Sequence, residues 1–195
     1  MDLREAEVTA QAQNGGRRGD WIRPAAWIGA AALFAAPFVA ERLTPEMQWN
    51  AFDFVVWGAM LGSGLLAMEL AMLGGGLAYR LGVGFAAAAA LGLVWVNGAV
   101  GIIGSEDDGA NLLFSGVLAT ALIGALLARF EAKGMARAMV AAAVAQAAVA
   151  VIALALGWAW ENVRELVGAT GLFGVLWLIS ARLFANEARA KAPAG

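Results

Sequence analysis

The chain has 195 residues, of which 62% are hydrophobic and 14% charged, whereas about 25% are charged in a typical soluble domain. A soluble protein of this length could not bury so much apolar surface, but a lipid bilayer solvates it directly. Cysteine and histidine are absent, which excludes disulfides, thiolate chemistry, and zinc or haem sites held by these residues. The net charge is only −2, so the distribution of the charges is more informative than their sum.

Six segments rich in Ala, Leu, Gly and Val are each long enough to cross a bilayer, which takes about 20 apolar residues. Their short connections make successive helices antiparallel neighbours. The sequence therefore predicts an all-α, polytopic transmembrane bundle of six helices over residues 21–184, between a flexible cytoplasmic tail (1–20) and a second cytoplasmic tail (185–195). The predicted helices cover residues 21–40, 52–73, 79–103, 110–130, 135–158 and 165–184.

The first predicted helix has the weakest pattern. Arg23 and Pro24 stand at its start, and Pro37 should kink or end it. A bulky residue, Phe38, stands where a signal-peptide cleavage site requires a small one, so we expect this segment to remain in the protein.

The basic residues predict the orientation of the bundle, because cytoplasmic loops of membrane proteins are enriched in Lys and Arg. Alternate gaps between the apolar segments contain nearly all of them, and Arg42 and Arg164 alone fall on the opposite side. We therefore expect both termini in the cytoplasm. The basic residues of the predicted cytoplasmic side are Arg4, Arg17, Arg18, Arg23, Arg80, Arg129, Lys133, Arg137, Arg182, Arg189 and Lys191.

An acidic group between the third and fourth predicted helices has two interpretations. Clustered carboxylates with an amide suit hard cations such as calcium, which would assign Glu106, Asp107, Asp108 and Asn111 to a cation or ligand site. Acids are also favoured at helix N-termini, where Asp108 or Ser105 would be a suitable N-cap. We favour capping, because the spacing does not match an EF-hand loop.

Three polar residues inside the apolar segments are the intramembrane candidates, and Glu69 is the ionisable one, which at this depth indicates function by default. Glu69 is expected near the inner interface, where it would reach water, pair with Arg80, or act as a gating carboxylate. Asn97 and Gln146 are expected to form hydrogen bonds between helices, with substrate contact as the alternative. Asn97 shares a predicted helix face with Gly101 and Gly104, and Gln146 with Ala142, Ala150 and Ala153.

Small residues and tryptophans predict where helices approach each other. Gly58-x-x-x-Gly62 and the Ala-rich fifth segment indicate close helix packing, either within the chain or with another copy. Trp57, Trp95 and Trp177 lie deep in their segments and are expected to fill helix contacts.

The stretch WVNGAVGIIGSEDDGANL, residues 95–112, and the segments at 123–129 and 134–137 resemble a group of small uncharacterised bacterial integral membrane proteins. The resemblance covers about a third of the chain and implies a location in the bacterial inner membrane. It implies no activity and therefore assigns no role to any of these residues.

These observations favour a non-catalytic membrane component that acts by helix packing in the lipid bilayer, with itself or with another membrane protein. A small permease or channel for an ion or solute is the alternative. It would need a wet path, for which Glu69, Asn97 and Gln146 are candidates. We expect no enzyme, because histidine, cysteine and paired intramembrane carboxylates are absent. We also expect no cofactor, metal or nucleic-acid partner.

Overall fold

A computed structural model describes residues 22–43, 49–105 and 107–192. The predicted tail at 1–20 lies outside these residues. The described part is all-α, without strands, and contains six helices long and apolar enough to cross a membrane, which confirms the predicted helix number. It divides into two units, one ending at Glu69 and one beginning at Leu70. Each unit is described by itself.

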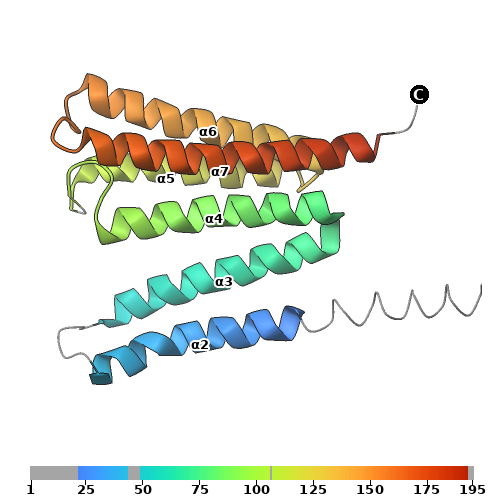
Figure 1. The fold of residues 1–195 in the computed structure, drawn as a ribbon, viewed down its shortest axis with the longest axis horizontal. Helices are drawn as coiled ribbons and strands as arrows, with labels where there is room; N and C mark the ends of the chain where they lie inside the picture. Colours follow the sequence, from blue (N-terminus) through green and yellow to red (C-terminus); the bar gives the residue numbers. More distant parts are fainter. Residues whose placement is uncertain (1–21, 44–48, 106, 193–195) are drawn as a thin grey trace, which may run out of the picture. The chain divides into compact units, whose positions relative to one another are not determined.

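The first unit contains helix α2 (Ile22–Leu43) and most of helix α3 (Ala51–Gly74) (Figure 1). α2 continues through Pro37 to Leu43, so the prediction that this proline could end the helix is wrong. α3 begins with a reciprocal cap. The Asn50 side chain accepts hydrogen bonds from the amides of Phe52 and Asp53, and the Asp53 carboxylate accepts one from the amide of Asn50.

Aromatic side chains connect α2 with α3. The ring of Phe38 stacks on that of Phe54 at 4.2 Å, and Trp57 Nε1 donates a hydrogen bond of 3.0 Å to the carbonyl of Leu33. A Cβ atom at Gly58 would lie 3.0 Å from the ring of Phe34, so this glycine allows the predicted close approach. Gly62 has no such neighbour within 4 Å.

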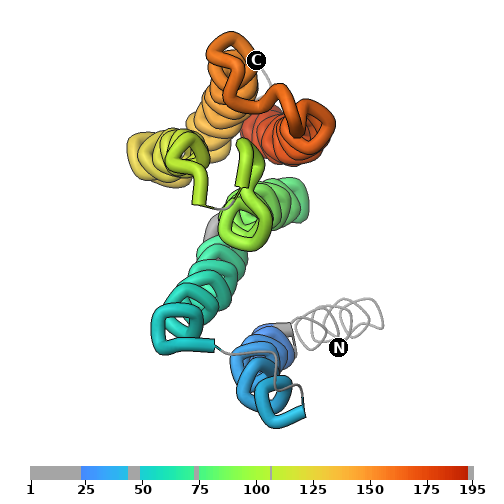
Figure 2. The backbone as a smooth tube through the Cα atoms, turned by 90° about the vertical axis from the view of Figure 1, so that its left-hand side faces the viewer, coloured from blue at the N-terminus to red at the C-terminus, as the bar shows by residue number. Residues whose placement is uncertain are grey.

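The second unit consists of α4 (Leu77–Ala99), the short 3-10 helix η1 (Gly109–Leu112), α5 (Leu113–Leu127), α6 (Ala132–Ala155) and α7 (Val163–Ala190). α6 packs against α5 and α7, and α7 packs against α4. Figure 2 shows these four long helices nearly end-on around a common core. We call the end where α4 terminates and α7 begins the Asn111 end, and the opposite one the Glu187 end.

One inward stripe on each long helix forms the core of the second unit. Small and bulky side chains alternate across it, which lets the helices interdigitate. Trp177 is buried and fills helix contacts as predicted, whereas half of the Trp95 surface is exposed. Other members of the core are Ala89, Leu93, Phe114, Val117, Met139, Ala142, Phe173 and Phe184.

Two helix ends differ from the predicted bounds by more than three residues. α4 ends at Ala99, four residues early, and Gly101 (φ +70°) and Gly104 (φ +65°) follow in the left-handed conformation that a helix cannot contain. α7 instead continues to Ala190, six residues into the predicted C-terminal tail. The charged composition of residues 185–190 concealed that Glu187 is buried against the start of α4.

Gly124 on α5 should be intolerant of even a methyl group. A Cβ atom there would lie 2.6 Å from Ala138 Cβ and 3.2 Å from Ala138 Cα on α6, so backbone would have to move. We expect Gly124→Ala to lower the free energy of unfolding in detergent by about 1–3 kcal/mol. Gly116→Ala on the same helix meets nothing within 4 Å and should not destabilise the protein. Equal stability of the two variants would contradict the α5–α6 packing.

Candidate functional site at the Asn111 end

Asn111 organises the segment between α4 and η1. Its Oδ1 accepts hydrogen bonds of 2.9 Å from the amides of both Ile102 and Ile103. Its Nδ2 donates to the carbonyls of Ile103 at 3.0 Å and Ser105 at 2.6 Å. The side chain is 9% exposed and makes four hydrogen bonds, so its amide is occupied by the chain's own backbone.

These bonds replace the ones that the backbone loses where α4 ends. Unpaired peptide groups are costly in apolar surroundings, and Ile102 and Ile103 are buried there. Asn162, just before α7, contributes a second amide, whose Nδ2 donates to the carbonyl of Ile102 at 3.2 Å and that of Gly104 at 3.4 Å. The side chain of Asn111 therefore holds the irregular segment to η1, and that of Asn162 holds it to the start of α7.

The described acidic residues of this end do not form a metal-binding cluster. Asp108 is the N-cap of η1 and accepts a 2.8 Å hydrogen bond from the amide of Ala110, which confirms the predicted cap. Asp107 is exposed, and Glu106 lies outside the described residues. Among the residues that the structure describes, no group of three or more acidic side chains could hold a metal ion.

A cavity of about 480 Å³ lies between the end of α4 and the start of α5. It brings together four of the predicted site residues, Asn97, Asp107, Asp108 and Asn111. A second cavity, of about 430 Å³, lies between the end of α4 and the start of α7. Its lining includes Val96, Asn162 and Glu165.

Asn97 differs from the prediction. Its Nδ2 donates a 3.1 Å hydrogen bond to the carbonyl of Leu93 in its own helix rather than to another helix. It shares no helix face with Gly101 and Gly104, because α4 ends at Ala99. Its buried Oδ1 has no hydrogen-bond partner among the described residues.

Gln146 on α6 is fully buried on the predicted stripe with Ala142, Ala150 and Ala153. Neither its Oε1 nor its Nε2 has a hydrogen-bond partner in the described part of the chain. The predicted interhelical hydrogen bond is therefore not formed there. Leaving a buried polar group without a hydrogen bond costs about 1–3 kcal/mol of folding free energy. A glutamine at this position is therefore not explained by helix packing alone.

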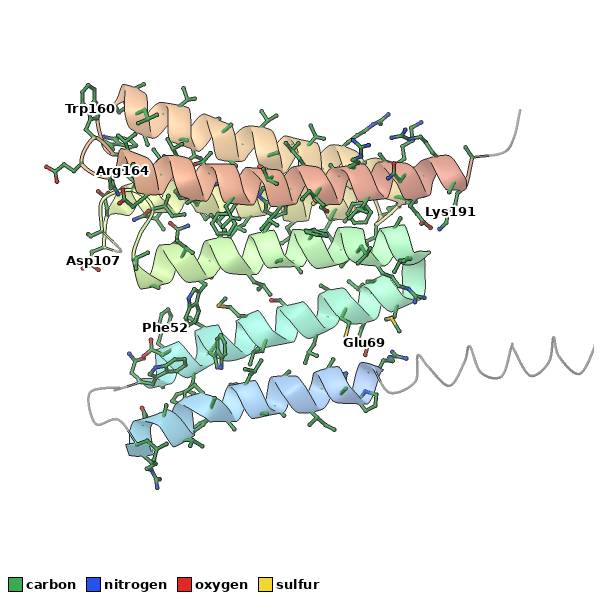
Figure 3. All side chains as sticks on the ribbon, viewed as in Figure 1. Phe52, Glu69, Asp107, Trp160, Arg164 and Lys191 are labelled. Carbon is green, nitrogen blue, oxygen red and sulfur yellow. The ribbon has the colours of Figure 1, made fainter. Side chains whose placement is uncertain are left out.

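Glu69 belongs to the first unit, and its partner is Arg23 rather than the predicted Arg80. The two side chains form an ion pair in which Arg23 Nε and Nη2 donate to the carboxylate. Trp27 Nε1 donates a further hydrogen bond of 3.3 Å to the same carboxylate. Figure 3 shows Glu69 and Phe52 near opposite ends of α3.

The prediction missed a carboxylate site at the Glu187 end. Glu187 Oε1 accepts a 2.9 Å hydrogen bond from the amide of Gly76, just before α4, and lies 3.2 Å from Lys191 Nζ. Tyr79 closes the same end, since its hydroxyl donates a 2.7 Å hydrogen bond to the carbonyl of Phe130. The sequence signal was the glycine run before α4, since a Cβ atom at Gly76 would lie 3.0 Å from the Glu187 carboxylate.

Comparison with known proteins assigns no family: no family model, no curated protein and no solved structure matches the chain. The function therefore has to be inferred from the geometry of the described residues.

Asn111→Asp tests the role of this amide in holding the irregular segment. The carboxylate keeps the acceptor for Ile102 and Ile103, but it places an anionic oxygen against the carbonyls of Ile103 and Ser105. We expect the free energy of unfolding to fall by about 1–3 kcal/mol. Asp107→Asn, at an exposed neighbour, should leave it unchanged. A stable Asn111→Asp variant would show that these hydrogen bonds do not hold the segment.

Proposed function

We propose that this chain is a non-catalytic component of the bacterial inner membrane that acts by helix packing against another membrane-embedded chain, with both termini in the cytoplasm. Six helices of sufficient length and hydropathy support the location in a membrane. The absence of cysteine and histidine from the sequence supports a role other than catalysis. The resemblance over residues 95–112 supports a bacterial inner membrane.

Charge supports the proposed orientation. Among the described residues of the second unit, Arg164 is the basic residue at the Asn111 end, where it lies near Asp107 and Trp160 in Figure 3, whereas Lys191 lies at the opposite end. Seven basic residues from several helix ends gather at the Glu187 end. The positive-inside rule assigns such an end to the cytoplasm. They are Arg80, Arg129, Lys133, Arg137, Arg182, Arg189 and Lys191.

Cysteine labelling tests this topology without background, because the parent chain has no cysteine. Ser105→Cys, exposed at the Asn111 end, should react with a membrane-impermeant maleimide in intact cells. Glu131→Cys, exposed between α5 and α6, should react only after the cells are permeabilised. The reverse labelling pattern would overturn the orientation. Gly134, near Glu131 at the start of α6, is not a suitable position for the cysteine, since a Cβ atom there would lie 2.5 Å from Ala128 Cβ.

The observation that carries the packing function is a set of glycines on α7 that make no close helix contact within the unit. A Cβ atom at Gly168, Gly171 or Gly174 would meet no atom within 4 Å. In contrast, a Cβ atom at Gly92 on α4 would lie 2.9 Å from the ring of Phe173, so this glycine serves packing inside the unit.

The α7 face that contains these glycines is apolar. Gly168 and Gly171 are exposed at a spacing of one helical turn, and Val175 and Leu178 continue the same exposed stripe. Small residues at such spacing allow the backbone of a second helix to approach closely in a membrane. A second copy of this chain is therefore the first partner to test.

Gly171→Leu should prevent this association without harming the unit itself. We expect the dimer dissociation constant in mild detergent to rise about tenfold, equivalent to ~1.4 kcal/mol. Mass measurement by light scattering or native mass spectrometry reads the dimer fraction. Gly116→Leu is the matched control, because Gly116 on α5 is equally open. A parent chain that is monomeric and co-purifies with no membrane protein would refute the packing function.

A further inference from the structure

Buried polar atoms without a partner are concentrated in three helices of the second unit. Among the described residues, the buried side-chain nitrogen and oxygen atoms that lack a hydrogen-bond partner all belong to α4, α6 and α7. They are Asn97 Oδ1, Thr170 Oγ1, Gln146 Oε1 and Nε2, and Trp177 Nε1. Gln146 is 0% exposed and Trp177 is 1% exposed, so water at the protein surface does not satisfy them.

These atoms lie on the faces that meet in the core. Thr170 follows the buried Leu166 by four residues, and Trp177 follows the buried Phe173 by four, so both occupy the inward stripe of α7. Gln146 occupies the inward stripe of α6. Asn97 follows the buried Leu93 by four residues on α4.

The register of the helices places these atoms in order of depth. Contacts of Gly92 with Phe173 and of Gly82 with Phe184 align α4 with α7, so Asn97 lies at the level of residue 168. At 1.5 Å per residue, Asn97 is therefore only about 3 Å in height from Thr170. Counted from the helix ends at Ala155 and Val163, Thr170 lies about 10 Å deep, Gln146 about 14 Å and Trp177 about 21 Å.

The two ends of this series of unpartnered atoms, Asn97 at the shallow end and Trp177 at the deep end, have different surroundings. Asn97 lines the cavity of about 480 Å³ that opens at the Asn111 end. Below Trp177, the Ser180 hydroxyl already donates a 2.7 Å hydrogen bond to the carbonyl of Gly82, and Phe184 is fully buried. The unpartnered atoms thus begin beside an open cavity and stop at a packed layer.

The chemistry of the series selects one class of ligand. It contains an acceptor at Asn97, a donor at Trp177, and groups that both donate and accept at Thr170 and Gln146. It contains no charged side chain, and an ion would have no counter-charge there. Steps of about 3 to 7 Å in depth match one or two hydrogen-bonded molecules the size of water.

From these observations we infer that the core between α4, α6 and α7 takes up small uncharged molecules that both donate and accept hydrogen bonds, which enter beside Asn97 and reach Trp177. Water is the smallest member of this class. The inference goes beyond the proposed packing function and does not depend on it, because the unpartnered atoms face the core and the open glycines of α7 face outward.

Cysteine reactivity tests whether a solute reaches the core. A thiol reacts as the thiolate, which forms only where water is present. In the full chain in detergent, Thr170→Cys should react with the small uncharged reagent methyl methanethiosulfonate at least about tenfold faster than Thr120→Cys. Thr120 is a matched control, since it is partly buried like Thr170 and lies seven residues from the start of α5, as Thr170 does from the start of α7, but its hydroxyl already donates a hydrogen bond to the carbonyl of Gly116. An ammonium-bearing methanethiosulfonate should react with neither variant.

Radiolytic labelling in ¹⁸O-water separates water from larger solutes. If the core is wet, the Trp177 side chain should incorporate ¹⁸O despite its burial, and Gln146→Leu should reduce this labelling several-fold. Labelled Trp177 with an unreactive Thr170→Cys would identify water itself as the molecule taken up. Equal, low reactivity of the two cysteine variants together with unlabelled Trp177 would overturn the inference.

Thermal unfolding of each variant checks that the variant is folded. A clear rise in melting temperature for Gln146→Leu would also contradict the inference, because such a rise would indicate that the parent amide is dry and unpaired.

Discussion

Peptide groups in an apolar environment must find hydrogen-bond partners within the chain, and this constraint determines most of the structure. Helices satisfy it by themselves, which is why the apolar segments form helices. The segment between α4 and η1 cannot satisfy it in this way, because two glycines with positive φ interrupt the helix there. Asn111 and Asn162 supply side-chain amides to the peptide groups that the helix leaves unpaired. A loop that resembles a ligand site in sequence is therefore largely a device for satisfying its own backbone.

Glycines in this protein have two different structural roles. Some accept a neighbour at a distance that a side chain would prevent, as Gly92 does with Phe173 and Gly124 with Ala138. Others, such as Gly168 and Gly171, face open space. The sequence alone does not separate these roles, because both occur in similar Gly- and Ala-rich surroundings. The separation requires the rotation of each helix about its axis, which only the packed structure defines.

The helices were predictable because their length and hydropathy are local properties. The Asp108 cap and the inward alanine stripe of α6 were predictable for the same reason, since spacing along the chain determines both. The partners of Glu69, Asn97 and Gln146 were not. Arg23 is 46 residues from Glu69 in sequence, and an amide chooses between its own helix and a neighbour by geometry that no local pattern contains. The two cavities depend in addition on where α4 ends, which the prediction placed four residues too late.

The carboxylate of Glu187 has a consequence for the assembly of the chain. It accepts a hydrogen bond from the amide of Gly76, 111 residues away in sequence and just before the first turn of α4. A ribosome releases α4 long before it has translated Glu187, since chains emerge N-terminus first. The beginning of α4 thus acquires its anionic partner only after most of α7 has been synthesised. A later helix thereby completes an earlier one, and a chain truncated shortly before Glu187 would keep α4 and most of α7 but leave this contact unmade.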